Sequence, residues 1–203
     1  MTVHLVLASA SPARLSTLRR AGVDPLVIVS GVDEEQVSGL DPFHLAGALA
    51  QLKAEAVASL PEIGAGALVL GCDSVLDLDS RALGKPGTPE VAARRWREMR
   101  GRSAVLHTGH CLIRAHDGAL ARATASTTVH FADVSDDEID AYVATGEPLH
   151  VAGAFTIDGL GGAFVERIEG DHHNVVGVSL PVVRGLVSHL GGQWTDLWQP
   201  TPT

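Results

Sequence analysis

The sequence predicts an α/β fold in which an elongated, mixed β-sheet is flanked by helices. Three observations predict it. Apolar, β-prone runs alternate with helical segments that begin at capping residues, and two long strand-like runs follow one another across an Asp-Gly turn. In addition, 45% of the 203 residues are hydrophobic, which is enough to bury a substantial core. The order strand, helix, helix, strand, helix, two strands, helix, strand, helix does not fit a uniformly parallel sheet.

The first expected strand covers residues 3–8 and leads directly into a helix. Ser11 can cap this helix, and Pro12 suits its first position. A strand that enters a helix through small residues directs free backbone N–H groups to one point, where the helix dipole adds positive potential. The loop therefore favours an anion such as phosphate, and Ser9, Ser11 and Arg14 can all donate hydrogen bonds to phosphate oxygens.

A short strand is expected over residues 26–29, with Glu34 in the loop that follows it. Asp41 can then cap a second helix, which should end near Leu60 and which carries Lys53 on an otherwise apolar surface. Helical spacing places four of its apolar residues on one face, which we expect to be buried: Leu45, Leu49, Leu52 and Ala56.

The next expected strand, over residues 67–71, delivers Asp73 at its end. In open α/β sheets, the carboxyl ends of strands are where ligands bind. Lys85 follows between a glycine and a proline, which hold its backbone in a defined loop. Thr88 is expected to cap a third helix that turns Trp96 and Met99 inward.

Two long strands, 104–115 and 119–131, are predicted to form a hairpin across His116-Asp117-Gly118. Three further elements are expected after it: a short helix with a capping box formed by Ser135 and Glu138, a glycine-rich strand over 155–165, and a last helix over 181–190. No linker or internal repeat is visible, so residues 1–203 are expected to form a single domain. The sequence does not place the tail over residues 193–203.

Composition limits the classes of function. Lys and Arg number 15 against 24 Asp and Glu, a formal net charge of -9, which argues against non-specific binding of nucleic acid. The two cysteines, Cys72 and Cys111, indicate neither a disulfide framework nor a zinc site and fit a reducing compartment. Neither a signal peptide nor a membrane span is visible. We therefore expect a cytoplasmic protein without a membrane partner.

Five charged residues lie at the edges of apolar elements: Arg14, Glu34, Lys53, Asp73 and Lys85. Taken alone, Glu34, Lys53 and Lys85 fit ordinary exposed surface residues. Asp73 alone fits a turn-forming aspartate as well, and Arg14 with the serines fits a helix cap. Together they form the smallest set that could perform metal-assisted attack on a phosphoric anhydride. Carboxylates and phosphate oxygens are ligands that Mg²⁺ prefers, and the metal lowers the pKa of a bound water. Lysine and arginine stabilise the charge on the transferring group.

Other candidate sites are weaker. The arginine-rich run over residues 94–102 fits a solvated helix face. His107 and His110 would point to opposite faces of a strand and so chelate poorly, and His172 and His173 fit exposed polar residues. No P-loop or dinucleotide fingerprint is present.

Taken in order, these segments resemble the Maf family of nucleoside triphosphate pyrophosphatases over nearly the whole chain. The resemblance rests on nine short segments: Ser9-Ala10-Ser11-Pro12-Ala13-Arg14, Val32-Asp33-Glu34, Leu52-Lys53-Ala54, Gly71-Cys72-Asp73-Ser74, Gly84-Lys85-Pro86, Thr108-Gly109, Ala152-Gly153-Ala154-Phe155, Gly159-Leu160-Gly161 and Asn174-Val175-Val176-Gly177.

The resemblance implies hydrolysis of a nucleoside triphosphate to its monophosphate and pyrophosphate, in a housecleaning role, with Mg²⁺ or Mn²⁺. It also implies a Maf/Ham1-like fold with two lobes around a central cleft, often as a homodimer. Asp73 matches the family's general base and Glu34 a second acid, and both are candidate metal ligands. The implied phosphate-handling residues are Ser9, Arg14, Lys53 and Lys85.

This chain departs from the family pattern at positions that help to select the base. Ala13 replaces the first arginine of the opening motif, Ser74 replaces a threonine, and Asp158 replaces a glutamine or glutamate. Ser74 and Asp158 are therefore candidate substrate-binding residues, but the preferred base stays open. Val151 also replaces a family lysine, which weakens a phosphate role for its loop.

Two alternative functions are consistent with the sequence. One is a nucleotide-binding regulator, linked to cell division, that binds a triphosphate without turnover. The other is a metal-dependent hydrolase of a non-nucleotide phosphate that uses histidines such as His172.

Overall fold

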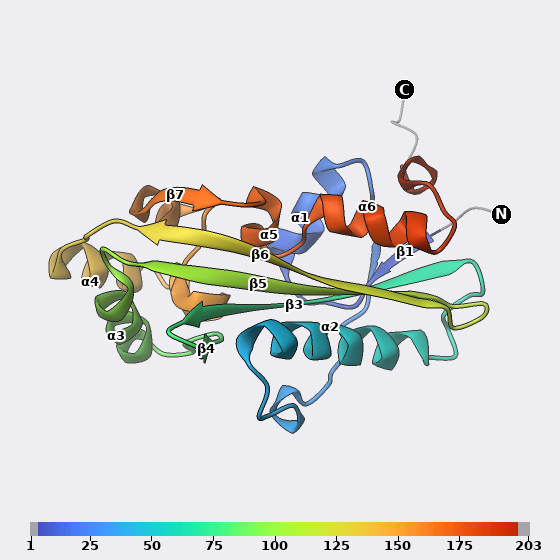
Figure 1. Cartoon of the computed structure of the whole chain (residues 1–203), viewed down its shortest axis with the longest axis horizontal. Coiled ribbons are helices and arrows are strands. Elements are labelled where there is room, and N and C mark those ends of the chain that lie inside the picture. Colours follow the sequence, from blue (N-terminus) through green and yellow to red (C-terminus); the bar gives the residue numbers. More distant parts are fainter. Residues whose placement is uncertain (1–3, 199–203) are drawn as a thin grey trace.

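A seven-stranded mixed sheet runs along the length of the molecule (Figure 1). The computed structural model describes residues 4–198. The strands are β1 (His4–Leu7), β2 (Leu26–Val27), β3 (Ala67–Leu78), β4 (Arg81–Leu83), β5 (Ser103–Arg114), β6 (Leu120–Phe131) and β7 (Val165–Glu169). Their order is β2-β1-β3-β5-β6-β7, with β4 paired to β3. Because β1 pairs in parallel with β2 and β3 while the other pairs are antiparallel, the predicted mixed α/β fold is confirmed.

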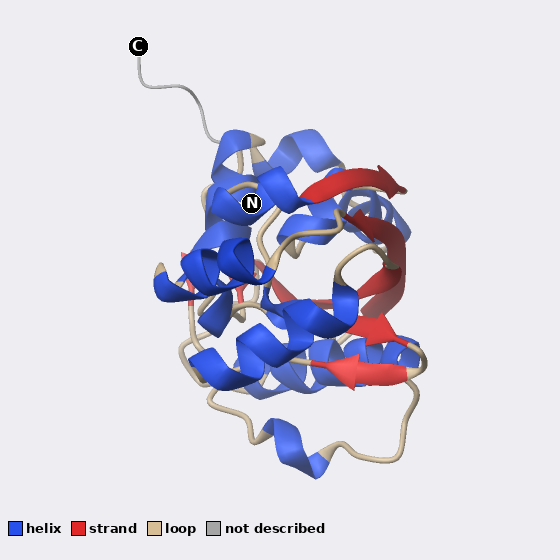
Figure 2. Cartoon of the chain, turned by 90° about the vertical axis from the view of Figure 1, so that its left-hand side faces the viewer, coloured by secondary structure: helices blue, strands red, loops and turns tan. Residues whose placement is uncertain are grey.

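Helices cover both faces of this sheet. They are α1 (Pro12–Arg20), α2 (Pro42–Ala58), α3 (Pro89–Met99), α4 (Asp136–Ala144), α5 (His172–Val176) and α6 (Leu180–His189). In Figure 1, α2 lies on one face, α1, α5 and α6 lie on the other, and α3 and α4 lie at one end. Figure 2 shows that the loop with the 3₁₀ helix η1 (Glu34–Gln36) projects from the side that carries α2.

Two large clusters of buried side chains stabilise the fold. One surrounds Trp96, whose indole nitrogen donates a hydrogen bond of 2.7 Å to the Ala154 carbonyl. The other lies between β1, β3 and helices α1 and α6, and includes Leu7 and Leu70. Strands β3 and β5 contribute buried side chains to both clusters, so these two strands connect the two parts of the core.

Helix starts follow the sequence expectations closely. The side chains of Ser11, Asp41, Thr88 and Ser135 each accept a backbone hydrogen bond at the start of their helix, and Ser135 completes the predicted capping box with Glu138. The hairpin of β5 and β6 is also present, and Gly118 in its turn has a φ of 70°. These features are encoded locally, which is why the sequence predicts them well.

The buried face of α2 differs from the prediction. Leu49 is buried as expected, but Leu45, Leu52 and Ala56 are only partly buried. The face against the sheet is instead built mainly from small residues: Ala46, Ala50, Ala54 and Val57. A Cβ atom on Gly71 would lie 2.1 Å from the Ala50 carbonyl oxygen, and one on Gly109 would lie 2.1 Å from that of Ala46. Because Gly71 and Gly109 have no side chains, the backbone of α2 can pack directly against β3 and β5.

Two further expectations were wrong. The strand predicted over 67–71 extends to Leu78, so Asp73 lies in its middle. The strand predicted over 155–165 is instead irregular backbone followed by the 3₁₀ helix η4 (Leu160–Phe164), and β7 begins only at Val165. The backbone N–H groups of Leu160 and Gly161 donate to the Glu147 carboxylate, so they are not available to a neighbouring strand.

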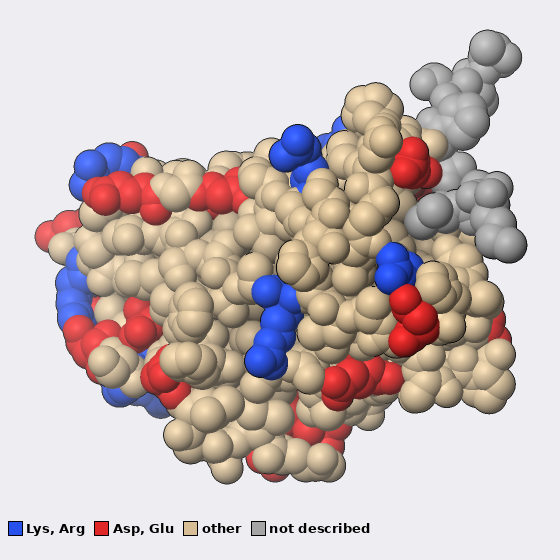
Figure 3. Space-filling model, turned by 45° about the vertical axis from the view of Figure 1, so that its right-hand side comes forward, with Lys and Arg blue, Asp and Glu red and all other residues tan. Residues whose placement is uncertain are grey.

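The remaining short helices are η2 (Glu147–His150), η3 (Ala152–Ala154) and η5 (Trp194–Leu197). Of the unplaced tail, residues 193–198 lead through η5, and residues 199–203 lie outside the described part of the chain. Within residues 4–198, no helix is both long enough and apolar enough to cross a membrane. Figure 3 shows acidic and basic side chains in small scattered groups over one face, without a broad basic patch among the described residues there.

Candidate active site

The candidate site lies at an open edge of β3. Strand β1 pairs with β3 only as far as Leu70, and β4 pairs with β3 only from Leu76 onward. Among the described residues, the stretch 71–75 therefore has no strand partner on this side. Asp73 is in the middle of β3, three residues beyond Leu70, where the parallel β1–β3 pair ends. The sequence expectation that Asp73 ends its own strand is wrong, and what leaves this residue accessible is the end of β1 beside it.

An ammonium group joins the two predicted acids at this edge. Lys53 Nζ lies 2.5 Å from Asp73 Oδ1 and 2.6 Å from Glu34 Oε1. The side chains of Lys53 and Asp73 are each only 11% exposed, whereas that of Glu34 is 50% exposed. The three residues come from α2, β3 and η1, so folding assembles a charged group that is dispersed in the sequence.

Burial controls the protonation of Asp73. It raises the pKa of this carboxyl above its usual value, and the negative charge of Glu34 acts in the same direction. The positive charges of Lys53 and Arg14 oppose the shift without cancelling it. A carboxylate with a raised pKa is a better proton acceptor, which is the property that a general base requires.

The Arg14 side chain connects the start of α1 by hydrogen bonds to the preceding loop, to β3 and to the end of α5. The residue is only 8% exposed. Its Nε donates to the Gly177 carbonyl at 2.7 Å, and its Nη1 donates to Ser9 Oγ and the Cys72 carbonyl, each at 2.9 Å. Its Nη2 donates to Ser74 Oγ at 3.0 Å. Four of the five guanidinium N–H groups are therefore used within the protein, and one remains for a ligand.

Ser9 and Ser11 have different parts in the loop. Ser11 Oγ caps α1 by accepting from the Arg14 backbone N–H at 3.4 Å. Ser9 Oγ accepts from the Ser11 backbone N–H at 3.2 Å as well as from the Arg14 side chain. Since both of these bonds use Ser9 as the acceptor, its own hydroxyl hydrogen is left to donate to an anion.

Lys85 lies apart from the paired charges. Its side chain is exposed, and within residues 4–198 it has no ion pair with Glu34 or Asp73. The loop is nevertheless held in place. The Gly84 carbonyl accepts from Arg95 Nη1 at 2.5 Å and from the Gly153 backbone N–H at 3.2 Å. Arg95 is a residue that the sequence pattern assigned only to a solvated helix face.

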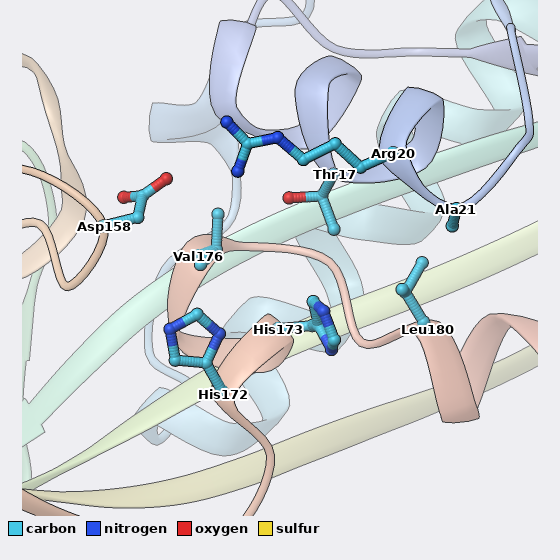
Figure 4. A pocket seen from close by; sticks show the side chains of 8 residues that line it. All are labelled: Thr17, Arg20, Ala21, Asp158, His172, His173, Val176 and Leu180. Atoms are coloured by element: carbon cyan, nitrogen blue, oxygen red, sulfur yellow. The ribbon is translucent and has the colours of Figure 1, made fainter.

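Asp158 lies in a separate pocket between α1 and α5. The pocket has a volume of about 160 Å³ and is lined by Thr17, Arg20, Ala21, Asp158, His172, His173, Val176 and Leu180 (Figure 4). The sequence pattern did not assign a role to Thr17 or Arg20. Thr17 is three residues from Arg14 and Arg20 is three residues from Thr17, a spacing at which side chains on one helix are neighbours, so this pattern could have indicated them.

The two carboxylates are suitable ligands for a divalent cation, but two side chains are too few to hold it alone. Glu34 and Asp73 offer the hard oxygen ligands that Mg²⁺ prefers, and both carboxylates contact the Lys53 ammonium. Among the described residues, no group of three or more His, Cys, Asp or Glu side chains could hold a metal. A divalent cation held beside these two carboxylates would therefore take its other ligands from phosphate oxygens and water, which is common for Mg²⁺.

Comparisons with known proteins point to one family. Residues 4–190 match the Maf family, described as "Maf-like protein". A protein of Streptomyces avermitilis named "Nucleoside triphosphate pyrophosphatase" is 59% identical over 197 residues, which cover 97% of this chain and 95% of that protein. Proteins with the same name from Salinispora tropica and Gloeothece citriformis are 57% and 50% identical, and cover 100% and 98% of this chain and 93% and 100% of their own lengths.

A solved structure is also similar in part. It is described as "the structure of the Staphylococcus aureus Ham1 protein" and superposes with a TM-score of 0.44 at 19% identity. The overlap covers 64% of this chain and 72% of the Ham1 chain.

Proposed function

Because this chain belongs to the Maf family, we propose that it is a nucleoside triphosphate pyrophosphatase that releases pyrophosphate and a nucleoside monophosphate. One observation carries the proposal beyond family membership. The buried Asp73 and the more exposed Glu34 meet at Lys53, beside a loop that has anion-binding groups at the start of α1. An acid with a raised pKa next to an anion site is what water attack on a phosphoric anhydride requires.

We assign the phosphates to the start of α1. The Ser9 hydroxyl, the remaining N–H of Arg14 and the positive end of the helix dipole would together neutralise part of the triphosphate charge. Lys85 would reach the phosphates from its exposed loop when substrate binds. These cations and donors stabilise the extra charge that develops on the phosphoryl group as the bond to the leaving pyrophosphate breaks.

Asp73 is assigned as the general base. Its carboxylate accepts a proton from the attacking water, whose oxygen forms a bond to the α-phosphorus. The bond from that phosphorus to the bridging oxygen breaks, and pyrophosphate leaves with the electron pair. Lys53 holds the carboxylate in place and favours its ionised form, because the positive charge opposes the effect of burial on the Asp73 pKa.

We further propose that Glu34 and Asp73 hold Mg²⁺ or Mn²⁺ together with phosphate oxygens. Such an ion supplies charge neutralisation and a more acidic bound water. The sequence expectation of this cofactor thus stays a prediction.

The pocket beside Asp158 is our candidate for the nucleoside end of the substrate. Ala21, Val176 and Leu180 contribute apolar groups to its lining, and Asp158 and Arg20 contribute charge. A flat heterocycle has apolar faces and polar edges, which suits such a lining. Asp158 would accept hydrogen bonds from donors on the base. Ser74 lies between this pocket and the phosphate loop, where it accepts a hydrogen bond from Arg14.

Further expectations are kept as proposals. We propose a cytoplasmic housecleaning enzyme that does not bind nucleic acid or membranes, which the acidic composition supports. We also propose a homodimer. In support, the edge strand β2 and the segment after it expose apolar side chains, among them Leu26 at 61% and Val29 at 61%.

Pyrophosphate release tests the proposal directly. The protein is incubated with canonical and modified nucleoside triphosphates in the presence of Mg²⁺, of Mn²⁺ and of a chelator. We expect release from at least one triphosphate with metal, and a loss of about 10²-fold or more in Asp73→Asn. Asp77→Asn, on the same strand, is the matched control and should stay active. Binding of every triphosphate without product would instead favour the nucleotide-binding regulator.

A further inference from the structure

Polar groups from four elements form a continuous series of hydrogen bonds beside the open edge of β3. Arg14 Nη2 lies 3.0 Å from Ser74 Oγ, and Ser74 Oγ lies 2.9 Å from Thr108 Oγ1. Thr108 Oγ1 in turn lies 3.1 Å from the backbone carbonyl oxygen of Asn174. Thr108 and Asn174 are fully buried, with 0% exposure, so water cannot replace any partner at that end of the series.

The direction of each hydrogen bond follows from the number of hydrogens available. A carbonyl oxygen can only accept, so the one hydroxyl hydrogen of Thr108 points to Asn174. Thr108 therefore accepts the hydroxyl hydrogen of Ser74. Ser74 in turn accepts from the Arg14 guanidinium, which has no acceptor of its own. Every hydrogen in the series thus points from α1 towards α5.

This order determines what Ser74 can offer to a ligand. Its only hydrogen is used by Thr108, and one of its two lone pairs is used by Arg14. A single lone pair remains. Ser74 is only partly buried, so a ligand can reach it. It can accept a hydrogen bond from an N–H or O–H group, but it cannot donate one to a phosphate oxygen.

Ser74 also lies beside the pocket that we assign to the nucleoside. A Cβ atom on Gly177 would lie 3.6 Å from Ser74 Oγ and 3.2 Å from Arg14 Nε, so the Gly177 backbone packs directly against both residues. Its φ of 118° is one that other residues rarely adopt. The preceding residue, Val176, lines the pocket of about 160 Å³. Ser74 is therefore situated between the phosphate loop and the pocket.

We propose that Thr108 is a positioning residue that fixes the Ser74 oxygen as a hydrogen-bond acceptor, and that Ser74 thereby selects a donor group on the nucleoside part of the substrate. The donor is either a ring N–H of the base or a hydroxyl of the sugar. This inference rests on the proposed function, because it takes a nucleoside triphosphate as the ligand. The family resemblance already links position 74 to selection of the base; the inference adds the kind of group that Ser74 recognises and the residue that fixes its hydroxyl.

Binding of non-hydrolysable analogues tests this inference without relying on turnover. The probes are α,β-methylene analogues of UTP and GTP, each in three forms: unmodified, methylated at the ring nitrogen (N3 of uracil, N1 of guanine), and 2′,3′-dideoxy. Dissociation constants are measured by calorimetry for the wild type, Thr108→Val and Thr108→Ser. Valine has nearly the shape of threonine but no hydroxyl, and serine keeps the hydroxyl.

We expect the wild type to bind one modified form about tenfold more weakly than the unmodified analogue, because that form has lost the donor. Weaker binding of the methylated form identifies the base as the donor, and weaker binding of the dideoxy form identifies the sugar. In Thr108→Val the Ser74 hydroxyl can rotate and donate, so the ratio should fall towards one. Thr108→Ser should restore the wild-type ratio.

Three results would overturn the inference: a wild type that does not distinguish the forms, a wild-type ratio in folded Thr108→Val, or no restoration in Thr108→Ser. If Thr108→Val does not fold, as judged by circular dichroism, Ser74→Ala replaces it and must lose the discrimination. The proposed function fails by a separate observation, namely no pyrophosphate release by the wild type from any natural triphosphate.

Discussion

Lys53 Nζ lies 2.5 Å from Asp73 Oδ1, although the two residues are 20 positions apart in the sequence and belong to a helix and a strand. The contact is mostly shielded from solvent, since each side chain is only 11% exposed. Within it, burial favours the protonated form of Asp73, and the nearby ammonium favours the ionised form. The balance between these two effects makes the pair sensitive to substitution and to pH.

Removing the Lys53 charge should move the activity to higher pH. The ammonium lowers the pKa of Asp73, so in Lys53→Met this pKa rises further. If Asp73 must be ionised to act as the base, the acid limb of the pH profile of kcat/KM shifts to higher pH, and activity at pH 7 falls. Lys53→Arg keeps the charge and should keep the position of the limb. An unshifted limb in Lys53→Met would argue against Asp73 as the base.

The raised pKa of Asp73 also makes stability depend on pH. A carboxyl whose pKa is higher in the folded than in the unfolded state binds its proton more tightly when folded. Its contribution is fully present below the unfolded value of about 3.9 and is lost as the pH rises through the folded value. The free energy of unfolding of the wild type, relative to Asp73→Asn, should therefore decline from about pH 4 upward. Urea unfolding across this range measures it, and a rise would contradict the assignment.

Replacing Arg14 by lysine should disrupt the phosphate loop even though the positive charge is kept. The guanidinium makes four hydrogen bonds in a largely buried position, and an ammonium cannot reproduce their geometry. We expect Arg14→Lys to lose about 3 kcal/mol of stability and most of the activity. Arg19→Lys, at an exposed site on the same helix, is the control and should leave the melting temperature and the rate unchanged.

Lys85 should matter for turnover without mattering for stability. Its side chain is exposed, and the loop around it is held by backbone contacts of Gly84. We expect Lys85→Ala to lower kcat by about 10²-fold, because charge stabilisation in the transition state is lost, while the melting temperature stays the same. A large drop in the melting temperature would show that the residue is structural instead.

A methyl group at Gly109 should destabilise the fold. The added Cβ would lie 2.1 Å from the Ala46 carbonyl oxygen and 2.7 Å from Gly47 Cα, so α2 would have to move away from β5. We expect Gly109→Ala to cost about 3 kcal/mol or more. A Cβ added at Gly64 would meet no described atom within 4 Å, so Gly64→Ala is the matched control. Equal stability of both variants in urea would contradict the close approach.

The sequence predicts the features that depend on neighbours along the chain. The capping residues Ser11, Asp41 and Thr88 each act within three residues, so their helices begin where expected. The buried face of α2 depends instead on Gly71 and Gly109, which lie on strands elsewhere in the sequence. The spacing of leucines along the helix carries no information about glycines on the sheet that packs against it, so it could not predict which face of α2 is buried.

The same distinction applies to the site. Sequence reasoning selects Glu34, Lys53 and Asp73 as separate residues, and the fold brings them together. It does not show that Lys53 joins the two acids. The bond from Arg14 to the Gly177 carbonyl spans 163 positions, so no local pattern could indicate that Arg14 is largely occupied within the protein.

The long strands β3 and β5 enter both clusters of buried side chains without a break. Neither end of the molecule therefore has a hydrophobic core that is independent of the other end. A fragment that contained only one cluster would interrupt β3 and β5, on which its buried side chains pack. Heating should consequently produce one cooperative melting transition rather than two. Any opening around the substrate would therefore have to bend these two strands, because they run from one cluster into the other.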